Sequence, residues 1–255
     1  MKWRHFTYVL VLATRATYLA QEKNSALGLV WHLLNPLVMT AVLFVVFRNA
    51  PFRGDNPNYE LFILVGVVHF NFFINTTTRS SANFLMSRSL ILNTTVPLEL
   101  LVLRQSSIEG LTLLIEVLLV LVLSAVIGTG LKSALIMYPV VLLGMLALSL
   151  GASLFLCALV VFLSDLSYLW NVFGRILFFV TPVFFTPDVV GVGFARLLLA
   201  LNPLTHLLQL ARKTLLYGGH ISLGEIGIAL VGPALVFALG VFIFRATRAR
   251  IPDYI

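Results

Sequence analysis

Long apolar segments are the feature of this 255-residue chain that most constrains its fold. A helix needs about 20 mainly apolar residues to cross the hydrocarbon core of a bilayer. Several stretches meet this requirement, so we predict an all-α integral membrane protein with a single membrane domain. The six predicted transmembrane helices cover roughly residues 29–47, 61–78, 106–127, 134–163, 168–185 and 223–244.

The composition excludes a soluble fold. Hydrophobic residues make up 60% of the chain and charged residues only 11%, whereas a typical soluble domain carries roughly 25% charged residues. Too few polar side chains remain to cover a water-facing surface. Cys157 is the only cysteine and the five histidines are scattered. The sequence therefore predicts no disulfide framework and no metal site.

The distribution of Lys and Arg predicts the orientation of the chain. Six transmembrane helices place both termini on one side, and that side carries ten Lys and Arg residues against six on the other. Basic residues concentrate on the cytoplasmic side of membrane proteins. We therefore expect both termini in the cytoplasm. The net charge of +7 is better explained by this rule than by nucleic-acid binding.

Three segments outside the predicted transmembrane helices have distinct patterns. Residues 3–24 mix apolar and charged residues at helical spacing, which favours an amphipathic helix in the membrane interface over a short soluble cap. The loop 79–105 is polar, and residues 83–93 within it can form a short amphipathic helix. The segment 186–221 is apolar but interrupted by Pro and Gly, which predicts short re-entrant helices. Ser222 and Glu225 then form a predicted capping box.

No motif for nucleotide hydrolysis or other catalysis is found in the sequence. The stretch closest to a phosphate-binding loop, 128–133, has Leu131 where a glycine must precede the lysine. Motifs of zinc proteases and serine hydrolases are absent as well. We predict no catalytic residues and no cofactor, so any ATP and Mg²⁺ would be bound by a partner subunit.

Ionisable side chains inside predicted transmembrane helices are candidates for function, because a charge is costly there. They include His69, Glu109, Glu116 and Arg175. One interpretation is structural, with Glu109 or Glu116 paired to Arg175 or His69 between helices. A second interpretation is a polar lining of a transport path, and a third is a proton relay.

Aromatic residues gather in two of the predicted transmembrane helices. One cluster contains Phe70, Phe72 and Phe73, and the other contains Phe178, Phe179, Phe184 and Phe185. Aromatic faces can pack against the C–H faces of sugar rings. The clusters are therefore candidates for the lining of a sugar passage, although any single ring can simply face lipid.

The order of these features resembles the permease subunit of polysaccharide ABC exporters, which move O-antigen, capsule or teichoic acid chains. The resemblance covers nearly the whole chain. It rests on the amphipathic N-terminal segment, the motif from Leu27 to Pro36 at the first transmembrane helix, and the polar loop 79–105. Further along it rests on Ser164-Asp165-Leu166, on Thr181 to Phe185, and on Leu201 to Leu204.

The resemblance implies a homodimer in the bacterial inner membrane with two nucleotide-binding ATPase subunits and a lipid-linked glycan as substrate. It implies that a coupling helix docks on the ATPase and that the first and fifth transmembrane helices of opposite protomers flank the passage. The chain departs from the family at Ser164, where the family often has Arg, so a weaker contact to the ATPase partner is expected there. The implied coupling residues are Asn83, Phe84, Leu85, Ser87, Arg88, Ser89, Asn93 and Asp165. The implied passage residues are Trp31, Phe70, Phe73, Phe178, Phe179, Phe184 and Phe185.

Three alternatives remain at this point. A small-molecule or lipid exporter of the same fold would not need a long aromatic path. An ion-coupled carrier would depend on Glu116 and His69 and would work without an ATPase. A membrane enzyme would need a cluster of acid, base or metal-binding groups, which the sequence does not contain.

Overall fold

The computed structural model describes residues 30–254 except 54, 55, 57, 94, 95, 129, 131, 164 and 192. Nearer the N-terminus it describes Tyr8, residues 10–12, Thr14, Arg15 and Thr17. Within this part of the chain the structure is helical and contains no strand, as predicted. Most of the predicted interface helix over residues 3–24 lies outside the described residues, and so does Ser164.

Within the described residues, five helices are long and apolar enough to cross a membrane. They are α2 (Val30–Phe47), α3 (Tyr59–Met86), α5 (Leu98–Val126), α6 (Tyr138–Val160), which extends the 3₁₀ turn Ser133–Met137, and α10 (Leu223–Thr247). These helices agree in position with five of the six predicted spans. Helices α3 and α5 extend well beyond the predicted limits, which shortens the loop predicted over residues 79–105.

The fifth predicted transmembrane helix, over residues 168–185, is shorter than expected. Helix α7 (Leu166–Val180) has only 15 residues. A residue before proline is driven out of the α region by the proline ring, and Thr181, which precedes Pro182, has extended backbone angles of φ −91° and ψ 136°. The helix therefore ends before Phe184 and Phe185, which lie in the following turn.

The segment predicted to be re-entrant forms two short helices. Helix α8 (Phe194–Leu201) and helix α9 (Pro203–Arg212), which continues into the π-helical turn Lys213–Tyr217, meet at a bend of 73°. Asn202 lies in the bend, where its side chain accepts a hydrogen bond from the Leu204 N–H at 3.0 Å and donates one to Thr181 Oγ1 at 2.9 Å. The bend is thus tied to the end of α7. The placement of the two helices within a membrane stays a prediction.

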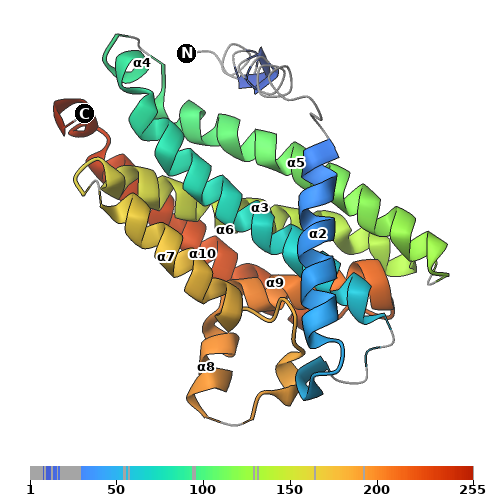
Figure 1. Cartoon of the computed structure of the whole chain (residues 1–255). Coiled ribbons are helices and arrows are strands. Elements are labelled where there is room, and N and C mark those ends of the chain that lie inside the picture. The colour runs from blue at the N-terminus through green and yellow to red at the C-terminus, as the bar shows by residue number, and fades with distance from the viewer. Residues whose placement is uncertain are drawn as a thin grey trace.

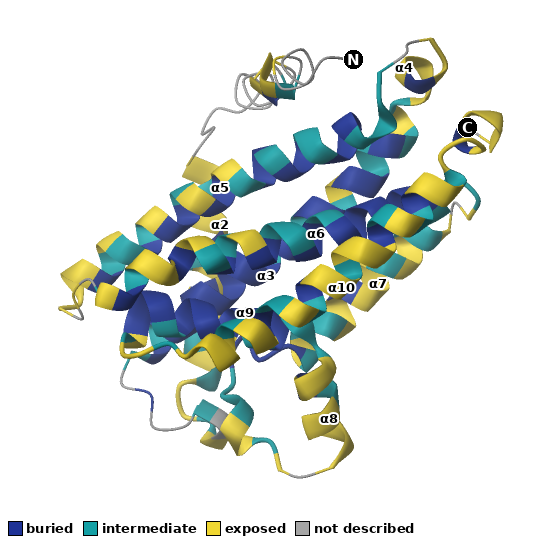
Figure 2. Ribbon diagram, turned by 180° about the vertical axis from the view of Figure 1, so that it is seen from behind, coloured by how far each residue is buried: buried dark blue, intermediate teal, exposed yellow. Residues whose placement is uncertain are grey.

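Helix α3 lies at the centre of the bundle and contacts α2, α5, α6, α7 and α9 (Figure 1). Residues 61–70 are buried on every side of the helix. A helix that is hydrophobic all round is typical of a buried position. Helices α2 and α10 lie at the outside and expose most of their apolar side chains (Figure 2), as expected for surfaces that face lipid.

The two ends of the bundle differ. The short helix α4 (Arg88–Asn93) and the C-terminal helix α11 (Ile251–Tyr254) lie at one end, and α8 lies at the other (Figure 1).

The predicted capping box at the start of α10 is confirmed, because Ser222 Oγ accepts from the Glu225 N–H and the Glu225 carboxylate accepts from the Ser222 N–H.

Helices α6 and α10 pack closely through glycines. A Cβ atom at Gly151 would lie 2.5 Å from the Cα of Phe237, and one at Gly240 would overlap the backbone of Gly151. Small residues allow such close approach, which drives helix association in membranes where lipid is as apolar as the side chains.

Gly240→Ala is therefore expected to destabilise the protein, although alanine is the better helix former. Overpacking costs roughly 1–3 kcal/mol, and the helix-propensity gain of about 1 kcal/mol does not offset all of it. Gly227→Ala, also in α10 but with open space around its Cα, serves as the control and should be neutral or stabilising. Thermal unfolding in detergent measures both changes. Equal melting temperatures for the two variants would contradict the proposed packing.

Candidate functional site

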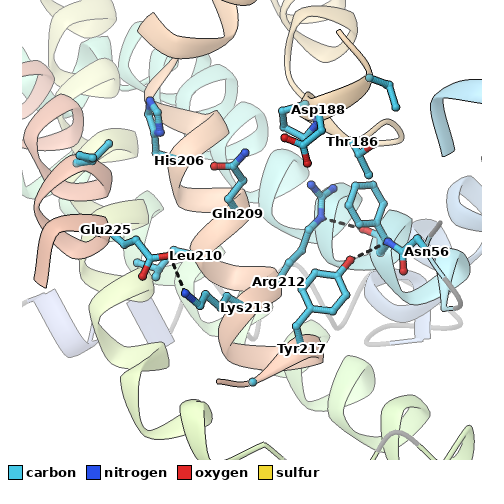
Figure 3. Close-up of a pocket in the computed structure, with 15 residues that line it drawn as sticks. Asn56, Thr186, Asp188, His206, Gln209, Leu210, Arg212, Lys213, Tyr217 and Glu225 are labelled. Carbon is cyan, nitrogen blue, oxygen red and sulfur yellow. Dashed lines mark hydrogen bonds and ion pairs between the residues drawn. The ribbon is translucent and has the colours of Figure 1, made fainter. Parts of the chain in front are cut away.

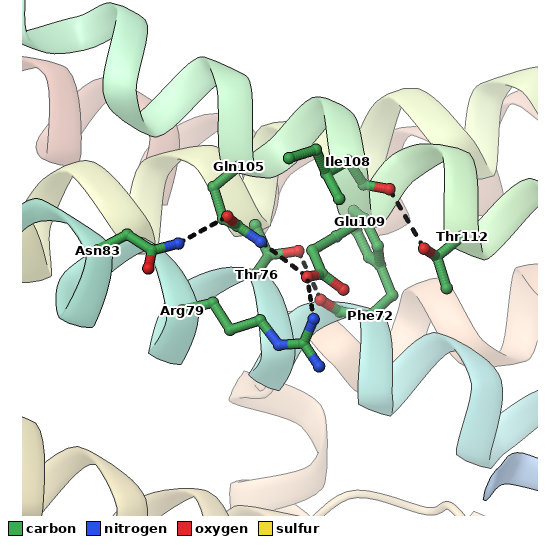
Figure 4. A network of polar contacts seen from close by, with 8 residues as sticks. All are labelled: Phe72, Thr76, Arg79, Asn83, Gln105, Ile108, Glu109 and Thr112. Atoms are coloured by element: carbon green, nitrogen blue, oxygen red, sulfur yellow. Dashed lines mark hydrogen bonds and ion pairs between the residues drawn. The ribbon is translucent and has the colours of Figure 1, made fainter. Parts of the chain in front are cut away.

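A polar network joins α3 and α5 inside the bundle (Figure 4). Arg79 Nη1 lies 3.1 Å from Glu109 Oε1, and Gln105 Nε2 donates to the same oxygen at 2.8 Å. Asn83 Nδ2 donates to Gln105 Oε1 at 2.8 Å. Arg79 and Asn83 are four residues apart on α3, and Gln105 and Glu109 are four residues apart on α5. Such spacing places each pair on one helix face, so the two faces meet.

The network compensates the charge of the buried Glu109 carboxylate. Glu109 is only 4% exposed, whereas Arg79 is 46% exposed. A charge in such a place is tolerated only when it is paired and hydrogen-bonded. Arg79 thus brings the compensating charge from the rim of the bundle to the buried Glu109.

The partner of Glu109 differs from the predicted one. Arg175, predicted as a possible partner, is exposed on α7. His69, the other predicted partner, is buried, with Nδ1 2.8 Å from the Val65 carbonyl and Nε2 3.1 Å from the Tyr138 hydroxyl. The sequence did not indicate Arg79 because the predicted end of the second transmembrane helix at residue 78 placed it in a loop.

A cavity of about 350 Å³ lies next to the network. Trp31, His32 and Asn35 on α2 form one wall, and the other walls come from α3 and α5. These walls contribute Asn75, Arg79, Glu109, Thr112 and Glu116. An aromatic ring, amides, a hydroxyl and carboxylates around one cavity are groups that hydrogen-bond and stack on polar ring compounds.

Glu116 differs from Glu109 although both carboxylates border the cavity. Its side chain is 7% exposed, and among the described residues it makes no hydrogen bond or ion pair. It is therefore available to a ligand or a proton in the cavity, whereas Glu109 is already engaged by Arg79 and Gln105.

The predicted passage aromatics differ in how far they are buried. Phe70, Phe73 and Phe184 are buried inside the helix bundle, where Phe70 packs edge-on against Phe178 with ring centroids 5.1 Å apart and Phe184 stacks on Phe47 at 4.7 Å. These rings pack α3, α7 and α2 against one another, and a place along a passage stays a prediction for them. Phe178 and Phe185 are half-buried.

Two of the predicted passage residues are largely exposed. Trp31 is 53% and Phe179 is 65% exposed, and Trp31 borders the polar cavity. For these two residues a place along a passage stays a prediction.

The predicted coupling residues lie at the end of the bundle that carries α4 and α11 (Figure 1). Phe84 is buried against Phe244, with ring centroids 6.1 Å apart, and Asn83 belongs to the polar network. A turn at Ser87 separates α3 from α4, so the predicted continuous helix over residues 83–93 is in fact broken. The exposed members are Arg88, Ser89, Asn93 and Asp165.

Comparison with known proteins identifies the family. The family model for the ABC-2 type transporter matches residues 8–216, which is most of the chain. The chain belongs to the ABC-2 type transporter family. It is therefore a membrane permease, and permeases of this family are transport subunits that work with an ATPase.

The curated relatives are similar over nearly their whole length. Two Klebsiella pneumoniae proteins named O-antigen export system permease protein RfbA are each 24% identical over 246 residues, which cover 96% of this chain and 94% of the relative. A Myxococcus xanthus protein of the same name is 25% identical over 239 residues, which cover 92% of this chain and 91% of the relative. The resemblance noted from the sequence motifs is thus confirmed at the level of the permease family.

The Arg79–Glu109 pair is expected to stabilise this ABC-2 permease asymmetrically. Arg79→Gln leaves the buried carboxylate without its charge partner and should lower the free energy of unfolding by about 1–3 kcal/mol. Glu109→Gln should cost less, because the half-exposed guanidinium can meet water. The double variant should recover much of the loss. Chemical unfolding in mixed micelles measures these differences.

Glu116→Gln is the matched control, because it neutralises a second carboxylate of α5 that is not engaged in an ion pair in the described part of the chain. It should leave stability nearly unchanged or raise it. If the losses of the two single variants simply add in the double variant, the two side chains do not interact.

Proposed function

We propose that this ABC-2 permease exports a lipid-linked polysaccharide of the O-antigen, capsule or teichoic acid type across the bacterial inner membrane. It would act as a homodimer with two copies of an ATPase subunit. The observation that carries this proposal is the similarity, over more than nine-tenths of the chain, to proteins named O-antigen export system permeases.

The exposed face of α7 supports an assembly of two copies. Tyr168, Val172 and Phe179 are more than half exposed, and Arg175 is exposed on the same helix. A guanidinium that faces hydrocarbon is costly. A water-filled passage or the surface of a second protomer would offer hydrogen-bond acceptors to the Arg175 guanidinium, whereas the hydrocarbon of lipid offers none.

The polar cavity supports a hydrophilic cargo. It lies beside the exposed Trp31 of α2, and its carboxylates and amides would hydrogen-bond hydroxyl groups while the indole ring packs against the face of a sugar. The lipid part of the substrate would enter from the side, and the sugars would pass between the α2 and α7 faces of the two protomers.

The arrangement of the helices supports a mechanism in which motion passes from the ATPase into the bundle. ATP binding would close the two partner ATPases, and α4 with the α6–α7 turn would receive that motion at the cytoplasmic end. Helix α3 runs from that end through the centre of the bundle. A shift of α4 would therefore reach every helix that packs on α3 and open the space between protomers.

A lipid exporter of the same fold is the second candidate. A groove of about 590 Å³ lies between Leu10 and Val11 on one side and Leu111 and Leu146 on the other, with Arg15 at its border. Its apolar side chains and the basic Arg15 would suit an acyl chain with an anionic headgroup. Deletion of the gene separates the two candidates, because only polysaccharide export predicts loss of a surface glycan.

Deletion of this permease gene is expected to remove one polysaccharide from the cell surface and to leave the finished chains on their lipid carrier inside the cell. Immunoblotting of surface and cytoplasmic-membrane fractions measures both. Restoration by the intact gene is the control. An unchanged surface polysaccharide together with a changed lipid composition would favour the lipid exporter instead.

The double variant Arg88→Glu, Ser89→Glu in α4 is expected to reduce co-purification with the ATPase at least about tenfold, because reversed charge at a docking surface opposes association. Arg196→Glu on α8, at the opposite end of the bundle, is the matched charge reversal and should leave the complex intact. Equal recovery of the ATPase with both variants would show that α4 is not the docking element.

A further inference from the structure

A second polar cavity, of about 950 Å³, is drawn in Figure 3, and the segments that line it lie at the end of the bundle opposite α4 (Figure 1). Its walls come from α9 with the π-helical turn, from the segment before α3, from the 3₁₀ turn Pro187–Val189 and from the start of α10. Polar side chains from these segments converge on it. They include Asn56, Asp188, His206, Gln209, Arg212 and Tyr217.

Arg212 forms the base of this cavity and is only 2% exposed. Its Nη2 donates to the Val183 carbonyl at 2.8 Å, its Nε donates to the Phe62 carbonyl at 3.3 Å, and its guanidinium carbon lies 3.4 Å from the centre of the Phe62 ring. Its Nη1 is buried and has no hydrogen-bond partner. A buried donor of this kind costs free energy unless something in the cavity accepts from it.

Asn56 lines the same cavity and has an acceptor oxygen that no donor in the described part of the chain reaches, whereas Arg212 has a donor without an acceptor. Asn56 is 7% exposed, and its Nδ2 donates to the Tyr217 hydroxyl at 2.7 Å. Its Oδ1 is buried and accepts no hydrogen bond. Among the described residues, the lining of the cavity thus contains a donor and an acceptor that make no hydrogen bond, and both side chains are held in place by their other bonds. A hydroxyl group both donates and accepts, so a compound with several hydroxyls can satisfy both.

The charges around the cavity favour a neutral ligand over an anion. Lys213 Nζ lies 2.6 Å from Glu225 Oε1, so these two charges compensate each other. Arg212 and Asp188 remain, one positive and one negative, and both border the cavity (Figure 3). An anion would meet Arg212 but also the Asp188 carboxylate. The ionised oxygens of an anion accept hydrogen bonds and do not donate them, so the anionic group itself would not satisfy Asn56 Oδ1.

The backbone of α9 and the π-helical turn keeps Arg212 and Tyr217 on one wall of the cavity. Arg212 is the last residue of α9 and Tyr217 ends the π-helical turn, which stops at Gly218 with a φ of 72°. π-Helical turns are rare and often occur at functional sites, because the wider turn redirects side chains. Here the turn directs Tyr217 toward Asn56 while Arg212 stays buried above it (Figure 3).

We propose that this cavity binds a neutral sugar residue through its hydroxyl groups. Arg212 Nη1 donates to one ring hydroxyl, Asn56 Oδ1 accepts from another, and Gln209, Tyr217 and Asp188 complete the polar contacts. The proposal rests on the proposed function in one respect only: a glycan that leaves the passage reaches this end of the bundle, where the site holds one sugar residue and hinders backward movement.

Saturation-transfer NMR tests this with the full chain in nanodiscs, together with any ATPase that co-purifies. The probes are glucose, galactose, mannose and N-acetylglucosamine, with glucuronate and inorganic phosphate as anionic probes. At least one neutral sugar should receive saturation. Asn56→Ala should weaken its binding about tenfold, as expected for loss of a buried hydrogen-bonding group. Asn58→Ala, the same change at a residue that does not line the cavity, should leave binding unchanged.

The alternative results are distinct. Binding of glucuronate or phosphate alone would overturn the proposal in favour of an anion site. Binding of no probe would show a cavity filled by water, and equal binding by both Asn variants would place the sugar elsewhere. If Asn56→Ala does not fold, Gln209→Leu replaces it. Because the assay needs neither ATP nor transport, absence of sugar binding to the unmodified chain together with intact export would reject this site and leave the proposed function standing.

Discussion

Every helix around α3 takes its position from contact with it. A membrane interior supplies no water, so backbone polar groups must be satisfied within helices and apolar surfaces gain nothing by leaving lipid. What holds such a bundle together is close packing and specific polar contacts. Helix α3 provides both. Residues 61–70 are buried on all sides, and near the C-terminal end of α3 the side chains of Arg79 and Asn83 make an ion pair and a hydrogen bond to α5.

The functional features follow from this central position. The polar network and its cavity occupy the face of α3 between α2 and α5, nearer the end that carries α4. The Arg212 cavity is built on the other end of α3, where the Phe62 ring and carbonyl hold the guanidinium. One helix thus connects the proposed ATPase docking element with both polar cavities. A rigid element of this kind can transmit a displacement from one end of the protein to the other.

Much of the architecture could be predicted from the sequence, because it depends on local patterns. Apolar length located five helices, and the capping box at Ser222 and Glu225 fixed the start of α10. The end of α7 was missed because hydropathy continues through Phe184 and Phe185, while the break depends on the conformation that Pro182 imposes on Thr181. A count of apolar residues does not record that constraint.

The candidate sites were harder to predict because they depend on contacts between distant residues. Arg212 lies in the segment 186–221, for which the sequence predicted only short re-entrant helices. Its burial depends on the Val183 and Phe62 carbonyls, which only the folded chain brings to it. The partner of Glu109 was missed for the same reason. The aromatic clusters were found by composition, but composition does not distinguish Phe70, which packs inside the protomer, from Phe179, which faces outward.

The central claim is that this ABC-2 permease forms the route through the membrane while a separate ATPase drives it. Reconstitution of the permease in vesicles that contain a lipid-linked polysaccharide tests this claim most directly, by measuring how much glycan becomes accessible to an enzyme on the far side. Our account predicts ATP-dependent transfer only when the ATPase subunit is present. Equal transfer by the permease alone would contradict it.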